Sequence, residues 1–139
     1  MFVDARGGFG HQAKLLKGAP GRVGVQDLAQ MEGEDIPGIE FQVHKFNQEQ
    51  PAESARAYYL RFVIHHDYGF DGNLEILANI RKAMKPGYSR LLVNECIIPE
   101  QTPSRFMTIA GMSMMSLEGW KGRRGQYREL LEAAGLKVG

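Results

Sequence analysis

A glycine-rich stretch near the amino terminus is the first place where this sequence could bind a ligand. Gly7, Gly8 and Gly10 follow a short apolar run that ends in Asp4. Glycines between a strand and a helix let backbone N–H groups approach a ligand closely, with the positive end of the helix dipole behind them. Asp27 ends the next apolar run, about 20 positions further on, where a carboxylate suits the two hydroxyl groups of a ribose. A glycine cluster alone is more often a plain turn, but the added acid predicts a nucleoside-binding site.

Acid–base residues form a second group of interest. His65, His66 and Asp67 come directly after the most apolar run of the chain, and Glu95 follows another apolar run. A histidine can act as a general base near neutral pH, and a nearby carboxylate can fix its tautomer. The alternative is a turn at the exit of a strand, in which both histidines are solvated. We find no metal-ligand spacing and no nucleophile–base pair, because Glu95 would disfavour the thiolate of Cys96.

The elements that would position these residues alternate between strand and helix patterns. A first strand ends at Asp4, and further strand patterns cover residues 22–26, 39–43, 57–64 and 91–93. Helix patterns cover residues 11–17, 72–84, 108–117 and 126–134, and residues 136–138 would begin another strand. Five strands interleaved with helices predict a doubly wound α/β sheet, whose ligands bind outside the carboxyl ends of the strands.

The composition indicates a single globular domain without a strong charge. The 139 residues carry a net charge of +1, which gives no general attraction to nucleic acid or to acidic membranes. The single cysteine excludes an internal disulfide and fits a reducing compartment. We find no signal peptide and no apolar stretch long enough to span a bilayer, so we expect a cytoplasmic protein.

Longer motifs run through the chain. Residues 3–11 read Val-Asp-Ala-Arg-Gly-Gly-Phe-Gly-His, and residues 58–68 read Tyr-Tyr-Leu-Arg-Phe-Val-Ile-His-His-Asp-Tyr. Further motifs lie at residues 25–28, 83–92, 94–99 and 130–137. Together they resemble the catalytic half of the small-molecule O-methyltransferases of fungi and plants, which use S-adenosylmethionine. The resemblance implies their Rossmann-like, mostly parallel sheet, and methyl transfer to a hydroxyl group of a small aromatic or polyketide-type secondary metabolite.

The resemblance also implies which residues bind the cofactor, S-adenosylmethionine. The glycine turn would hold its methionine part, and Asp27 would hold its ribose. The full set of matching cofactor-binding positions is Asp4, Gly7, Gly8, Gly10, Asp27, Leu28 and Lys85. A small-molecule acceptor would be the second ligand.

In this family a histidine in a His-Asp-Trp motif deprotonates the acceptor hydroxyl, and a glutamate at the position of Glu95 orients it. Two neighbouring histidines match that motif here. Counting from Arg61 favours His65 as the base. The order His-Asp-aromatic and the spacing to Glu75 favour His66 instead, and we expect His66 to be the base.

Several positions depart from the family pattern. Arg6 stands where the family has its first motif glycine, and Lys45 stands where it has an acid that helps to place the adenine. Gly111 replaces an aspartate, and residues 120–124 replace a Glu-Arg-Thr motif that would add a second carboxylate near the histidine. These changes favour a second hypothesis, a relative that keeps the fold as a binding or cyclisation scaffold and does not methylate.

The ends of the sequence suggest a third hypothesis. Members of the family carry an N-terminal helical region that forms their dimer, and two further strands that complete their sheet. Residues 1–139 match only the cofactor-binding domain between these parts, so we expect a sheet truncated at both ends. Such a domain would self-associate, or would fold firmly only with a partner chain.

Overall fold

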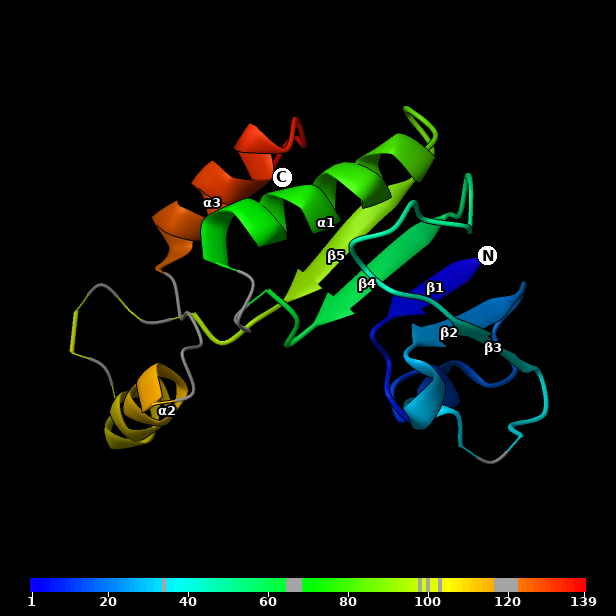
Figure 1. Ribbon diagram of the computed structural model, residues 1–139, viewed down its shortest axis with the longest axis horizontal. Coiled ribbons are helices and arrows are strands. Elements are labelled where there is room, and N and C mark those ends of the chain that lie inside the picture. The colour runs from blue at the N-terminus through cyan, green and yellow to red at the C-terminus, as the bar shows by residue number, and fades with distance from the viewer. Residues whose placement is uncertain (34, 65–68, 98, 100, 103, 117–122) are drawn as a thin grey trace.

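The computed structural model describes the chain except residues 34, 65–68, 98, 100, 103 and 117–122. Its centre is a five-stranded sheet in which every neighbouring pair of strands is parallel (Figure 1). The strands are β1 (Phe2–Ala5), β2 (Val23–Asp27), β3 (Ile39–Val43), β4 (Ala57–Arg61) and β5 (Arg90–Asn94). Their order is β3-β2-β1-β4-β5, so the chain builds the sheet outward from β1 in one direction and from β4 in the other. The structure confirms the doubly wound α/β fold that the sequence predicts.

The register of the sheet brings the carboxyl ends of the strands to one edge. Ala5 of β1 lies opposite Gln26 of β2 and Leu60 of β4. Asp27 at the end of β2 lies opposite Val43 at the end of β3. Because the winding direction reverses between β1 and β4, a ligand of such a sheet binds in the crevice outside these ends.

Two helices cover the β4 and β5 side of the sheet. Helices α1 (Gly69–Ala83) and α3 (Arg124–Ala133) lie close together there (Figure 1). The main apolar core joins them to the sheet, and its fully buried side chains include Tyr58, Leu60, Leu77 and Leu130. Residues four apart lie on the same face of a helix, which is why the apolar stripe at positions 76, 77 and 80 faces this core.

Three shorter or more distant elements complete the fold. A 3-10 turn, η1 (Ala13–Leu16), packs Ala13 against Val23 and Val25 of β2 in a second apolar cluster. Another 3-10 turn, η2 (Ala29–Met31), follows β2. Helix α2 (Arg105–Ser116) lies away from the sheet (Figure 1). No helix among the described residues is long and apolar enough to cross a membrane.

Strand β4 is shorter than the predicted strand at residues 57–64. It ends at Arg61, because Phe62 has a φ of +55° that turns the backbone out of the sheet. The backbone N–H groups of Val63 and Ile64 then donate to the carboxylate of Glu95 instead of to a strand. The predicted strand is therefore wrong over its last three residues.

Two other predictions differ from the structure. The predicted helix at residues 11–17 is only the turn η1, because Gly18 and Pro20 follow it at once and η1 is too short to propagate. Residues 136–138 form no strand. The N–H of Leu136 donates to the carbonyl of Leu131, and Gly135 has a φ of +76°, so this segment closes the end of α3. The remaining strands and longer helices begin and end within three residues of their predicted bounds.

Candidate functional site

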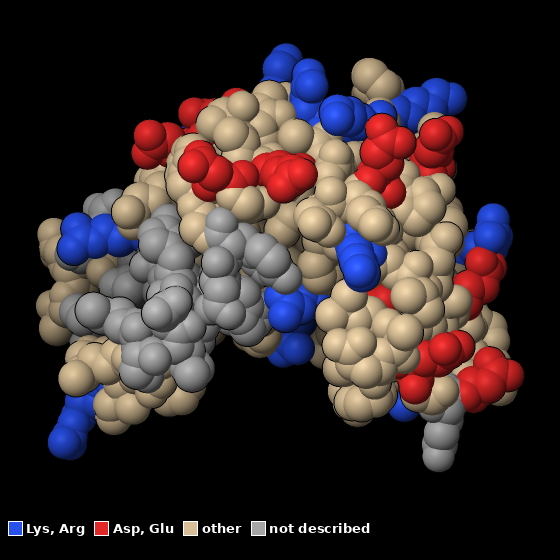
Figure 2. Space-filling model, in the orientation of Figure 1, with Lys and Arg blue, Asp and Glu red and all other residues tan. Residues whose placement is uncertain are grey.

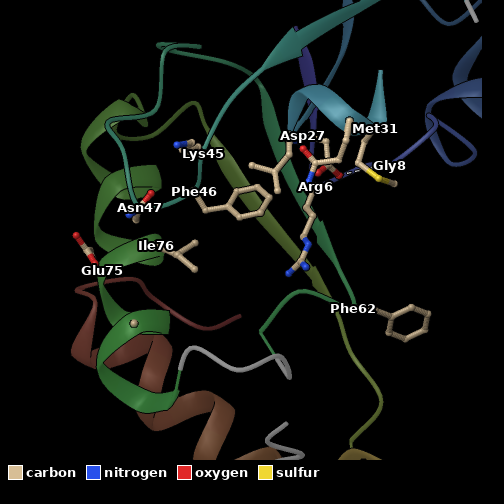
Figure 3. A pocket seen from close by; sticks show the side chains of 13 residues that line it. Arg6, Gly8, Asp27, Met31, Lys45, Phe46, Asn47, Phe62, Glu75 and Ile76 are labelled. Carbon is tan, nitrogen blue, oxygen red and sulfur yellow. Dashed lines mark hydrogen bonds between the residues drawn. The ribbon is translucent and has the colours of Figure 1, made fainter. Parts of the chain in front are cut away.

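A cleft of about 650 Å³ opens at the carboxyl ends of the strands (Figure 3). Gly8 after β1, Asp27 at the end of β2 and Phe46 after β3 line it. Phe62 after β4 and Ile76 of α1 line its other sides. Figure 2 shows Lys and Arg atoms bordering the hollow on this side of the molecule. The cleft occupies the crevice expected from the strand order, and its volume suits a small molecule.

Asp27 joins the end of β2 to the glycine turn. Its Oδ2 atom accepts a hydrogen bond of 2.9 Å from the backbone N–H of Gly8, and its Oδ1 atom accepts one of 2.8 Å from Leu28. The side chain is almost fully buried, so these two bonds hold the carboxylate in one orientation at the cleft wall. A carboxylate has about four lone-pair sites, so acceptor capacity remains for the hydroxyl groups of a ligand. The structure thus brings together three of the predicted cofactor-binding residues, Gly8, Asp27 and Leu28.

Asp4 lies beneath the glycine turn and does not line the cleft. Asp4 is 2% exposed, and among the described residues its Oδ2 atom has no hydrogen-bond partner. Burial raises the pKa of Asp4 to about 6, although a hydrogen bond from the backbone of Ala13 and the charge of Arg61 oppose the shift. A Cβ atom at Gly7 would lie 2.7 Å from this carboxyl group, which explains why the turn has no side chain there.

Two other predicted cofactor-binding residues lie outside the cleft. Gly10 is buried and lines a separate cavity of about 230 Å³ with Phe9 and Phe41. Lys85 follows the end of α1, beyond the amino end of β5, and its Nζ atom lies 5.9 Å from the ring centroid of Tyr88. Because α1 runs antiparallel to the strands, Lys85 lies at the edge of the sheet opposite the cleft.

Arg6 occupies the first position of the glycine turn in a left-handed conformation, with a φ of +63°. Glycine adopts this conformation without steric cost, whereas other residues adopt it rarely. The Arg6 side chain lines the cleft, and its guanidinium carbon lies 5.7 Å from the ring centroid of Phe46. The turn therefore keeps the backbone shape of a glycine-rich turn and adds a cation to the ligand-facing wall.

The loop after β3 contributes Phe46, which sequence reasoning missed, next to Lys45, whose position the sequence motifs had identified. Phe46 is buried and presents its ring to the cleft, while Lys45 is exposed at the rim (Figure 3). The buried ring of His44 lies edge-on to Phe46, at 6.3 Å between ring centroids. Burial lowers the pKa of His44, which favours its neutral form beside the aromatic ring. The position of Phe46, three residues after the end of a predicted strand, was the available signal for its role.

Arg61 was also missed as a site residue. It ends β4, next to β1 in the sheet, and its charge acts on the buried carboxyl group of Asp4. A cation at the end of the strand beside the glycine turn could have been foreseen once the strand order was known.

Glu95 holds the backbone that leads toward the predicted base. Its Oε1 atom accepts hydrogen bonds from the N–H groups of Val63, at 2.7 Å, and Ile64, at 2.9 Å. The predicted catalytic residues His65 and His66 lie outside the described residues. Glu95 thus orients the chain immediately before these histidines.

The family model for the O-methyltransferase domain matches residues 23–137 of the chain. The chain belongs to the O-methyltransferase family. This confirms the resemblance that the sequence motifs indicate. The O-methyltransferase family uses S-adenosylmethionine, and solved structures similar to this chain contain that cofactor or S-adenosylhomocysteine.

Individual O-methyltransferases and related structures match nearly the whole chain. Demethylsterigmatocystin 6-O-methyltransferase of Aspergillus flavus is 38% identical over 145 residues, which are 99% of this chain and 37% of that protein. The crystal structure of OxaC with S-adenosylhomocysteine and oxaline has a TM-score of 0.91 and 32% identity, over 99% of this chain and 38% of OxaC. A pericyclic reaction enzyme has a TM-score of 0.87 and 32% identity, over 97% of this chain and 37% of that enzyme. The chain therefore spans less than two fifths of the length of these relatives.

The cleft fits the cofactor of the O-methyltransferase family. Asp27 can accept hydrogen bonds from ribose hydroxyl groups, and Phe46 offers a ring face to a flat base. Arg6 is the cleft residue that fits least well, because it adds positive charge to a cleft that would hold a cationic ligand.

Proposed function

We propose that this chain is the cofactor-binding part of an S-adenosylmethionine-dependent O-methyltransferase that methylates a hydroxyl group of a small aromatic or polyketide-type metabolite. One observation carries the proposal: the cleft at the carboxyl ends of the strands contains a buried carboxylate, Asp27, bonded to the N–H of Gly8 in the glycine turn. The acceptor class is supported by the activity of the Aspergillus flavus relative, which acts on demethylsterigmatocystin.

Methyl transfer requires the protein to position the cofactor and the acceptor and to remove one proton from the acceptor hydroxyl. The cofactor supplies a methyl group that is already activated on a sulfonium. Asp27 would hold the ribose, and Phe46 would contact the adenine. Glu95 fixes the backbone at Val63 and Ile64, immediately before the residues that include the proposed base. We assign His66 as the base that takes the hydroxyl proton, with His65 as the alternative.

Calorimetric titration with S-adenosylmethionine and S-adenosylhomocysteine tests the cofactor site. We expect Asp27→Asn to weaken binding by about tenfold or more, because a charged hydrogen-bond acceptor for the ribose is lost. Glu40→Gln is the matched control, since Glu40 pairs with Arg22 on the exposed part of the same sheet, outside the cleft. No binding of either ligand by the wild type would contradict the proposed function.

The proposed base can be tested by initial rates of methyl transfer to hydroxylated aromatic acceptors. His66→Ala should lower turnover by roughly 100-fold or more, the usual contribution of a positioned general base. His65→Ala should lower it much less. The reversed order would transfer the role to His65, and unchanged turnover in both variants would contradict general-base catalysis by this pair.

A second candidate function is a relative that binds the cofactor without using its methyl group. The cation at Arg6 favours it, and so does the similarity to a pericyclic reaction enzyme. This candidate would bind S-adenosylmethionine tightly and leave it unconsumed with every hydroxyl acceptor. Release of S-adenosylhomocysteine on incubation with an acceptor separates the two functions.

A further inference from the structure

Gln26, the residue before Asp27 in β2, and Gln50 pair their side-chain amides in the interior of the protein. The Nε2 atom of Gln26 donates a hydrogen bond of 2.7 Å to Oε1 of Gln50, and the Nε2 atom of Gln50 donates one of 2.9 Å to Oε1 of Gln26. Both residues are buried. If the two side chains separated, buried polar atoms on each would lose these partners, so the pair ties the chain at Gln50 to the sheet.

The segment of residues 44–50, which we call the arch, is held on β2 at both of its ends. At its start, the N–H of His44 donates a hydrogen bond of 2.9 Å to the carbonyl of Asp27, the last residue of β2. At its end, the amide pair joins Gln50 to Gln26, the neighbouring residue of β2. The arch therefore leaves the sheet and returns to it at adjacent positions of one strand.

The middle of the arch forms part of the cleft wall. Lys45, Phe46 and Asn47 line the cleft, and Figure 3 shows these three residues beside the space that it encloses. Inside the arch, the N–H of Gln48 donates a hydrogen bond of 2.9 Å to the carbonyl of Lys45. That local turn shapes the arch but does not join it to β2, so the two ends determine where this wall lies relative to Asp27.

Gln26 supports the glycine turn as well as the arch. Its backbone carbonyl accepts hydrogen bonds from the N–H groups of Arg6, at 2.7 Å, and Gly7, at 3.3 Å. Its side chain holds Gln50 at the end of the arch. Two parts of the cleft that are distant in the sequence thus share one buried anchor in the sheet.

We infer that Gln50, through its amide pair with Gln26, is a positioning residue that fixes the arch as a preformed wall of the cleft. The inference rests on the proposed function, because it uses the affinity for an adenosyl ligand as the property that the wall controls. A wall that is ordered before binding spares the ligand the entropic cost of ordering it. Neither glutamine lines the cleft, so both act through the arch.

Isothermal titration calorimetry with S-adenosylhomocysteine measures the affinity, and hydrogen exchange at the amide of Gln48 reports the order of the arch. Gln50→Ala should weaken binding by at least about fivefold and speed this exchange by a similar factor. Gln42→Ala is the matched control. Gln42 accepts a hydrogen bond of 2.9 Å from the same Nε2 atom of Gln26, but it belongs to β3 and not to the arch. It should leave both measurements within about twofold of the wild type.

Gln50→Glu gives a pH profile that a mere loss of packing would not produce. Its ionised carboxylate keeps an acceptor for Gln26 but has no proton to donate to Oε1 of Gln26, whereas the protonated carboxyl group has one. Burial raises the pKa of such a group, so its affinity relative to wild type should rise as pH falls from about 8 to about 5. Gln50→Ala should stay constant relative to wild type, because the nearby titrating groups, His44 and Asp27, are common to both proteins.

The outcomes separate the inference from the function on which it rests. Tight binding with the same dissociation constant in the wild type and in Gln50→Ala would overturn the role of Gln50 and leave the proposed function intact, because the apolar packing of Phe46 would then suffice to hold the wall. An equal loss in Gln42→Ala, or a flat relative profile for Gln50→Glu, would also overturn it. Absence of binding by the wild type would overturn the proposed function, and exchange at Gln48 would still decide whether the amide pair orders the arch.

Discussion

The space between the glycine turn and the end of β1 admits no side chain at Gly7. A Cβ atom there would lie 2.7 Å from both Cγ and Oδ2 of Asp4 and 3.0 Å from Cγ1 of Val25. Asp4 is buried and belongs to a central strand, so its carboxyl group cannot turn outward to make room. Gly7 is thus required by packing, whereas the neighbouring Arg6 shows that the left-handed position of the turn tolerates a side chain.

We expect Gly7→Ala to lower the free energy of unfolding by roughly 1–3 kcal/mol, because packed atoms around Asp4 must move. Urea denaturation measures this change. The matched control is Gly111→Ala, which adds the same methyl group in α2, where no described atom outside the helix backbone and the two neighbouring residues lies within 4 Å. It should change the free energy of unfolding by less than about 1 kcal/mol. Equal losses in both variants would contradict the steric explanation.

Asp4 also predicts a pH dependence of stability. Burial raises its pKa from 3.8 to about 6. Between these values the native state keeps the proton and the unfolded state loses it, so this contribution to stability is lost as pH rises through the window. Relative to wild type, Asp4→Asn should therefore become more stable as pH rises from about 4 to about 7. Urea denaturation of both proteins at each pH measures the difference, in which the other titrating groups cancel.

Glu40 supplies a control of opposite sign for this measurement. The guanidinium of Arg22 donates two hydrogen bonds to the carboxylate of the exposed Glu40 and holds the pKa of Glu40 below its usual value. The contribution of this ion pair to stability is present above the pKa that Glu40 has in the unfolded state, and it is lost as pH falls. Glu40→Gln should therefore lose stability relative to wild type as pH rises. A constant difference between Asp4→Asn and wild type over the whole range would show that Asp4 does not titrate in this window.

At the scale of elements, the path of the chain after β4 depends on Glu95, the residue that directly follows β5. Phe62 turns the chain out of the sheet, and the carboxylate of Glu95 accepts the two N–H groups that would otherwise lack a strand partner. Asn73 of α1 adds a hydrogen bond of 3.0 Å to the carbonyl of Ile64. The segment before the predicted base is thus held from two elements at once.

We expect Glu95→Ala to speed hydrogen exchange at the amides of Val63 and Ile64 and to lower the free energy of unfolding by roughly 1–3 kcal/mol, because two buried donors lose their acceptor. Glu95→Gln keeps an oxygen acceptor and should have a smaller effect. Asn94→Ala, which removes an exposed hydrogen bond to Tyr59, is the neighbouring control and should leave both amides protected. Unchanged exchange in Glu95→Ala would contradict the positioning role of Glu95.

The same elements show what the sequence could predict and what it could not. Apolar periodicity located five strands, and glycine spacing with Asp27 located the ligand end of β1 and β2, because both are local patterns. The early end of β4 depends on Glu95, which lies more than 30 residues away in the chain, so no local pattern reports it. Phe46, which lines the cleft, and Arg61, whose charge acts on Asp4, were missed for a related reason, since both placements follow from the strand order.

At the scale of the whole molecule, the strand order joins these parts into one site. With β1 and β4 adjacent in the sheet, the glycine turn after β1 and the segment after β4 flank the same crevice. The loops after β2 and β3 close one side, and α1 closes the other. The crevice is therefore bordered by Asp27 and Gly8, which we propose to bind the cofactor, and by the segment that precedes the proposed base.

Two surfaces remain apolar and uncovered within the described chain. Among the described residues β5 pairs only with β4, and its Leu92 is 46% exposed. On α2, the side chains of Phe106, Ile109 and Met112 are 74%, 63% and 67% exposed and follow one another at three-residue spacing. An open strand edge can pair with another chain, and clustered apolar side chains favour association.

We therefore expect this 139-residue chain to self-associate at concentrations on the order of micromolar, as measured by size-exclusion chromatography with light scattering. The double variant Phe106→Ser with Ile109→Ser should shift the population toward monomer, because it removes most of the apolar surface of α2. Leu15→Ser is the matched control, since Leu15 is 78% exposed but lies on η1, far along the chain from both surfaces. A monodisperse wild-type monomer with a sharp, concentration-independent thermal transition would contradict the prediction, because it would show that neither surface needs a partner.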